Sequence, residues 1–189
     1  MAIAITLLIL EVRVPEHGPL FPALLQLWPS YLAYLASFFT IGIIWLNHHA
    51  FFGRVRQIDH VLHWWNLLLL LTVSFLPFPT AVLAAHVRGE GADARCSVVF
   101  YGLIGVLMTF PWVLMWRRLA QRPELMEPEY DRAFAVAEGR RAWVGVVVYG
   151  LCMGVGMISP VAALVLFAAV AVFYGVTSQG LAVAAKHEA

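Results

Sequence analysis

The chain has 189 residues, of which 62% are hydrophobic and 12% charged, against about 45–50% and about 25% in an ordinary soluble domain. So few charged side chains cannot cover a water-soluble domain of this length, and the mean hydropathy of +0.82 indicates contact with lipid. Twelve Phe, seven Trp and six Tyr exclude a disordered chain, and a net charge of +1 leaves no basic surface for nucleic acid.

The chain begins with a short apolar run over residues 1–12. As a helix, its first ten residues would extend about 15 Å, half of a hydrocarbon core about 30 Å thick. The run has no basic segment before it and ends in Glu11 and Arg13, a pattern unlike a secretory signal peptide. We interpret it as the C-terminal half of a transmembrane helix whose first half lies outside this sequence.

Longer windows without Asp, Glu, Lys or Arg follow, and each is a candidate span because a charge at the centre of a membrane helix costs about 2.5–3.5 kcal/mol. The last window is long enough for two spans, with Ser159-Pro160 as the natural turn. The windows predict an all-α, polytopic membrane protein, one domain over residues 1–189 with six transmembrane helices, the first truncated. The predicted spans are residues 1–12, 27–52, 60–86, 96–116, 142–158 and 160–185.

Arginine and lysine residues divide unequally between the two ends of the predicted bundle. An arrangement with both termini in the cytoplasm places nine of them inside and three outside, the bias that the positive-inside rule expects. Six of the nine are arginines of a polar stretch over residues 117–141, which also carries five carboxylates. We expect this stretch to be a cytoplasmic helical linker.

Polar residues inside membrane spans are expensive, so each is a functional candidate. The densest group lies near the cytoplasmic end of the second span and consists of Trp45, Asn47, His48 and His49. Adjacent histidines point about 100° apart on a helix, so these two cannot face one pocket. His60 and His63, across the next loop, could add zinc or haem ligands, but no carboxylate or cysteine completes a set. We predict no bound metal or cofactor.

Prolines and glycines mark packing features within the spans. Pro77 and Pro79 lie inside the third span, where Pro77 removes a helix hydrogen bond and produces either a fixed kink or a hinge. Gly150 and Gly154, one turn apart, favour close approach of a neighbouring helix.

Several kinds of catalytic or transport motif are absent from the sequence. It has no nucleophile elbow with a Ser-His-Asp set, no phosphate-binding glycine loop and no pair of intramembrane carboxylates. The interiors of the predicted spans carry no formal charge. These absences disfavour an enzyme or an ion-coupled carrier and favour a passive pathway lined by apolar and hydroxyl side chains.

Three segments carry a family resemblance: AIAITLLILEVRVP (residues 2–15), SFFTIGIIWLNHHAFF (37–52) and NLLLLLTVSFLPFPT (66–80). In this order they resemble prokaryotic members of the transmembrane protein 175 family. The resemblance implies a subunit of a potassium-permeable, leak-like cation channel, a multi-pass protein of the cell (plasma or inner) membrane. It also implies a homotetramer in the lipid bilayer that passes monovalent cations, with the first helix of each subunit lining the pore.

The resemblance implies roles for the first helix. Ile3 matches the apolar constriction, Thr6 the hydroxyl layer one turn on, and Leu7 and Leu10 further narrow points. Their common helix face is no independent evidence, because residues 1–10 are apolar throughout except Thr6.

The family signature RxxxFSD, which precedes this run, is absent from the sequence. The resemblance implies that the Ser and Asp of this signature form hydrogen bonds with polar residues of neighbouring helices. Trp45, Asn47, His48 and His49 lie at the same level of the predicted bundle, and we expect them to form a polar network between helices. Without the Ser and Asp of the signature, we expect the chain to fold as the family does and to conduct poorly or not at all.

Two alternatives stay open. One is a membrane haem or redox protein that uses His48 or His49 with His60 or His63, which a visible absorption spectrum would detect. The other is a non-conducting membrane scaffold, which ion flux and oligomeric state together would distinguish from a channel.

Overall fold

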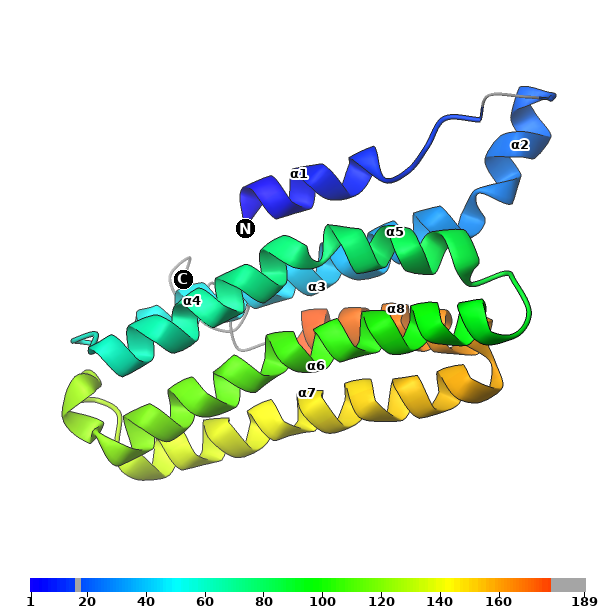
Figure 1. The fold of residues 1–189 in the computed structure, drawn as a ribbon. Helices are drawn as coiled ribbons and strands as arrows, with labels where there is room; N and C mark the ends of the chain where they lie inside the picture. Colours follow the sequence, from blue (N-terminus) through cyan, green and yellow to red (C-terminus); the bar gives the residue numbers. More distant parts are fainter. Residues whose placement is uncertain (16–17, 178–189) are drawn as a thin grey trace.

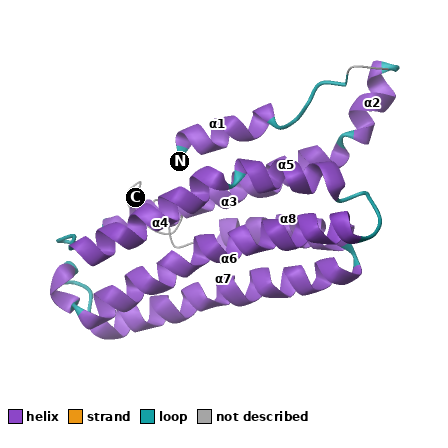
Figure 2. Ribbon diagram, in the orientation of Figure 1, coloured by secondary structure: helices purple, strands orange, loops and turns teal. Residues whose placement is uncertain are grey.

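The computed structural model describes residues 1–15 and 18–177, and every regular element within them is helical (Figures 1 and 2). The all-α prediction is therefore confirmed. In chain order the elements are α1 (Ala2–Leu10), α2 (Leu20–Gln26), α3 (Trp28–Phe52), α4 (His60–Phe75), α5 (Pro77–His86), α6 (Ala92–Gln121), the 3-10 turn η1 (Pro123–Leu125), α7 (Arg132–Ile158) and α8 (Pro160–Thr177).

Four segments of the described chain are long and apolar enough to cross a membrane: α3, the pair α4–α5 taken together, α6 and α7. Helix α8 is apolar but shorter, and α1 has nine residues. Six spans with both termini in the cytoplasm therefore stay a prediction, and the predicted end of the last span, at residue 185, lies outside the described residues.

The predicted third span is broken at its first proline (Figure 1). Helix α4 ends at Phe75 and α5 begins at Pro77, which has no N–H for the helix ladder. The Leu76 N–H bonds to the carbonyl of Val73 in a tighter turn, at an N–O distance of 3.2 Å. The Thr80 hydroxyl donates to the carbonyl of Leu76 at 2.8 Å, so the backbone around the break has hydrogen-bond partners.

The polar stretch over residues 117–141 consists largely of the ends of two long helices. Helix α6 continues to Gln121, and α7 begins at Arg132, where the Asp131 carboxylate accepts from the Phe134 N–H at 2.8 Å. Both helices are longer than the spans that the charge-free windows predict. Arginine has a high helix propensity, and Asp is a preferred N-cap, so charge need not end a helix.

Helices α6 and α7 pack closely side by side through glycines (Figure 1). A Cβ atom added at Gly105 would lie 2.3 Å from a ring atom of Tyr149, and one at Gly156 would clash similarly. The predicted packing role of Gly150 and Gly154 is wrong within this chain, since a Cβ at either meets no atom within 4 Å. The i, i+4 spacing alone does not say which side of α7 faces α6.

Candidate functional site

Helix α1 lies along the outside of the bundle, against α3 and α5 (Figure 1). It is buried there through Ala4 and Leu8, one helical turn apart, which are 5% and 0% exposed. Both side chains are apolar. The contact between α1 and the rest of the chain at these positions is therefore a narrow apolar seam.

The residues predicted to line a pore lie away from that seam, and we call them the α1 ridge: Ile3, Thr6, Leu7 and Leu10. All four are exposed, Ile3 at 76% and Leu10 at 73%. The Thr6 hydroxyl donates to the carbonyl of Ile3 at an O–O distance of 2.9 Å. The ridge thus presents apolar side chains and one hydroxyl, without a formal charge, to whatever lies beside the chain.

The four residues predicted to form a polar network near the end of α3, Trp45, Asn47, His48 and His49, lie in three different environments. Nε2 of His48 lies 2.8 Å from Oδ1 of Asn66 on α4; because an amide oxygen only accepts, we assign the proton to Nε2. His49 is exposed and its ring stacks on Trp45, with centroids 6.2 Å apart. Asn47 lines a cavity. Of these four residues, the structure brings His48 into a hydrogen bond with a neighbouring helix.

The histidines that could complete a metal or haem site lie on the first turn of α4. His60 and His63 are both exposed, whereas His48 bonds to Asn66. Within residues 1–15 and 18–177, no three His, Cys, Asp or Glu side chains gather closely enough to hold a metal ion. Among these residues, the structure therefore does not gather the histidines into a three-ligand metal site.

Sequence analysis missed a buried hydroxyl cluster, which consists of Ser37, Thr80 and Tyr101. Oγ of Ser37 lies 2.7 Å from Oγ1 of Thr80 and 2.9 Å from the Tyr101 hydroxyl oxygen, and each residue is at most 2% exposed. Because Thr80 donates to a backbone carbonyl, Ser37 donates to Thr80 and Tyr101 donates to Ser37. The signal in the sequence was a hydroxyl residue in each of three apolar spans, one of them beside the prolines.

The hydroxyl cluster joins α3, α5 and α6 directly beside the α4–α5 break. Helix α1 rests on α3 and α5. The Ser37–Thr80 bond therefore links the two helices against which α1 lies.

An ion pair ties the α3–α4 loop to α6 at the arginine-rich end of the bundle. Nε and Nη2 of Arg118 lie 2.8 and 2.6 Å from Oδ2 of Asp59, whose other oxygen accepts from the Leu62 N–H at 2.8 Å and caps α4. Burial works to raise the pKa of Asp59, but the Leu62 N–H and the Arg118 guanidinium outweigh it, so that the pKa lies below its usual value.

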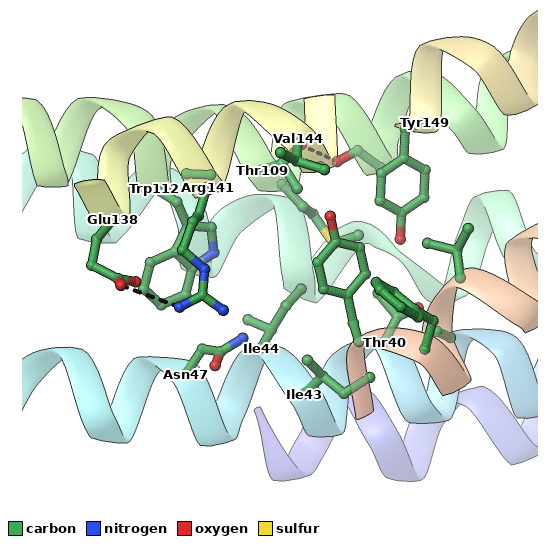
Figure 3. Close-up of a pocket in the computed structure, with 18 of the residues that line it drawn as sticks. Thr40, Ile43, Ile44, Asn47, Thr109, Trp112, Glu138, Arg141, Val144 and Tyr149 are labelled. Carbon is green, nitrogen blue, oxygen red and sulfur yellow. Dashed lines mark hydrogen bonds and ion pairs between the residues drawn. The ribbon is translucent and has the colours of Figure 1, made fainter. Parts of the chain in front are cut away.

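A cavity of about 350 Å³ lies between α3, α6, α7 and α8 (Figure 3). It is separate from the α1 ridge, since no residue of α1 lines it. Arg141 and Glu138 form an ion pair beside it, with Nη1 and Oε1 3.3 Å apart.

Comparison with known proteins gives consistent matches. The sequence profile of the family described as endosomal/lysosomal potassium channel TMEM175 matches residues 1–77. A protein from Streptomyces collinus, named as a potassium channel, is 39% identical over 177 residues, which cover 92% of this chain and 85% of that protein. Another from Chamaesiphon minutus, also named as a potassium channel, is 43% identical over 136 residues, 69% of this chain and 66% of that protein.

The fold also matches a solved structure. The crystal structure of a lysosomal potassium-selective channel TMEM175 homolog from Chamaesiphon minutus superposes with a TM-score of 0.80 at 34% sequence identity. The match covers 93% of this chain and 90% of that chain. The structural similarity therefore extends over nearly the whole chain, and the family profile includes the segment that carries the α1 ridge.

Proposed function

Because the chain belongs to the TMEM175 family, we propose that it is a subunit of a potassium-permeable, leak-like cation channel of the cell membrane. Two relatives named as potassium channels and the fold of a potassium-selective homolog support the proposal. The observation that carries it is the α1 ridge, an uncharged face turned away from the bundle. Potassium and other monovalent cations would be the permeant ions, with no cofactor.

We propose further that four copies assemble around an axis lined by their α1 ridges. One ridge cannot enclose a pathway, whereas identical ridges related by closed rotational symmetry can. At such an axis Ile3 would form the constriction, Thr6 a ring of hydroxyls, and Leu7 and Leu10 further narrow points. An apolar constriction can block ions by losing its water, and hydroxyls can replace part of an ion's hydration.

In the membrane, we propose one multi-pass domain with six spans and both termini in the cytoplasm. The loops over residues 53–59 and 122–131 lie between helices at the same end of the bundle (Figure 1). They carry Arg54, Arg56 and Arg122, and the ends of the adjoining helices add Arg117 and Arg118. This excess of arginine supports a cytoplasmic position for that end.

Potassium efflux from liposomes tests the proposal. The purified chain would be reconstituted, and its oligomeric state measured by native mass spectrometry. We expect a tetramer and a small efflux, because the RxxxFSD signature is absent from the sequence and Ile3 narrows the pathway. A variant with RxxxFSD added before Met1 should give a larger efflux. A stable oligomer whose efflux equals that of protein-free liposomes both with and without the added signature would favour the scaffold alternative and contradict the proposal.

A further inference from the structure

The cavity between α3, α6, α7 and α8 is a candidate ligand site that the proposed pore does not use. Its volume of about 350 Å³ lies within the roughly 300–1,000 Å³ typical of small-molecule sites. Most of the wall is apolar. The apolar lining includes Ile43, Ile44, Met108, Trp112, Val170 and Phe173.

Charged side chains of the lining lie at one end of the cavity. Figure 3 shows Glu138, Arg141 and Asn47 together at that end, whereas Thr40 and Tyr149 lie at the other. Arg54 also lines the cavity. The Arg141 guanidinium at that end offers an anion a positively charged donor. Arg141 is half exposed, and one of its five N–H donors bonds to Glu138.

A hydrogen-bond donor lies farther along the cavity. The Tyr174 hydroxyl oxygen is buried and has no hydrogen-bond partner among the described residues. A Cβ placed on Gly145 would lie 3.8 Å from this oxygen, so the hydroxyl is level with Gly145, one helical turn beyond Arg141 on α7. One turn of helix rises about 5.4 Å. A ligand with an anionic end at Arg141 would therefore meet a donor about one turn deeper.

The cavity can be reached from the side of the bundle. Val144 on α7 and Phe173 on α8 both line it and are 52% and 61% exposed. Arg141 directly precedes the predicted span 142–158, so the charged end lies at the level of the membrane surface. The apolar part lies at the level of the acyl chains. A molecule that enters between α7 and α8 would come from the lipid itself.

We propose that this cavity binds an anionic lipid of the surrounding bilayer, with one acyl chain between α3, α6, α7 and α8. The anionic headgroup pairs with Arg141, and an ester carbonyl accepts a hydrogen bond from Tyr174. Charge at the surface, a donor one turn deeper and a wall that is mostly apolar beyond it follow the order of groups along such a lipid. The proposal does not depend on conduction, because the site is separate from the α1 ridge.

Native mass spectrometry of the delipidated protein tests the headgroup contact. The probes are phosphatidylglycerol and phosphatidylcholine with identical oleoyl chains. We expect one phosphatidylglycerol to bind per chain, in preference to phosphatidylcholine. Arg141→Gln should reduce this preference by roughly tenfold, the order expected for a charge-assisted hydrogen bond. Arg140→Gln is the matched control, since Arg140 is exposed on the preceding position and does not line this cavity.

A second pair of variants tests entry of the acyl chain. Val144→Trp should obstruct the opening and reduce binding of both lipids, whereas Val147→Trp should not, because Val147 is 56% exposed and lies outside the cavity lining. Equal binding of the two lipids to the wild type would overturn the proposal. So would equal losses in Arg141→Gln and Arg140→Gln, or unchanged binding in Val144→Trp, because each would indicate a nonspecific lipid shell.

Discussion

Helix α1 and helix α6 differ sharply in how far their own chain buries them. Helix α6 buries fourteen of its thirty residues, and glycines let α7 lie against it. Helix α1 buries two of its nine residues, and its ridge faces outward. The contacts of α6 are thus supplied within one subunit, whereas most of α1 is left for other molecules. This difference is the reason why we propose that α1 acts through assembly of several copies.

The largest expected stability effect concerns the α6–α7 contact. Gly105→Ala would place a Cβ 2.3 Å from the ring of Tyr149, and overpacking of this kind costs about 1–3 kcal/mol. The matched change Gly150→Ala meets no atom and should stabilise by about 0.5–1 kcal/mol through helix propensity. Thermal unfolding in detergent micelles measures both. Equal melting temperatures would contradict a tight contact between α6 and α7 at Gly105.

A somewhat smaller loss of stability is expected from a change in the hydroxyl cluster, which links α3 and α5, the helices against which α1 lies. Ser37→Ala removes both hydrogen bonds of Ser37 and leaves the buried Tyr101 hydroxyl without its acceptor, at a cost of about 1–2 kcal/mol. The control is Ser74→Ala, because Ser74 is exposed and bonds to the carbonyl of Leu71 in its own helix. If both variants unfold alike, the cluster does not hold α3, α5 and α6 together.

The smallest change in stability is expected for the Asp59–Arg118 ion pair at the arginine-rich end of the bundle, and this change depends on pH. The pKa of Asp59 is lowered from its ordinary value of 3.8 in the folded chain. The ion pair with Arg118 therefore stabilises the folded state at a pH above 3.8, and this contribution is lost as the pH falls through the folded pKa. Asp59→Asn keeps an N-cap acceptor but loses the charge facing Arg118. It should cost about 0.5–1 kcal/mol at neutral pH.

Unfolding curves at pH 7 and at a pH below the folded pKa of Asp59, which is lower than 3.8, measure this contribution. The difference between wild type and Asp59→Asn should shrink there, since the wild-type carboxylate is then protonated in the folded chain as well. A difference that is constant over this range would mean that the Asp59–Arg118 pair contributes nothing through its charge.

Composition and charge placement were sufficient to predict an all-α membrane protein, because charged residues are expensive inside a bilayer whatever the tertiary contacts. They could not predict which residues of α1 face outward. Apart from Thr6, residues 1–10 are all apolar, so the packing of Ala4 and Leu8 on α3 and α5 decides the orientation.

The same limit applies to the other features that sequence analysis missed. Ser37 is separated from Thr80 by 43 positions and from Tyr101 by 64, so the fold brings the three hydroxyls together. Gly150 and Gly154 have the spacing of a packing motif, but no close neighbour fills the space beside them. Spacing along one helix shows which residues share a face, and only the other helices determine what that face contacts.

The most direct test of the central claim compares Ile3→Asn with Ile158→Asn in potassium efflux from liposomes. Both residues are exposed, at 76% and 86%, and both changes replace an apolar side chain by the same amide. If four α1 ridges line the pathway, Ile3→Asn should admit water to the constriction and raise efflux severalfold, whereas Ile158→Asn should leave it unchanged. Equal efflux from the two variants would contradict the placement of Ile3 in the pore.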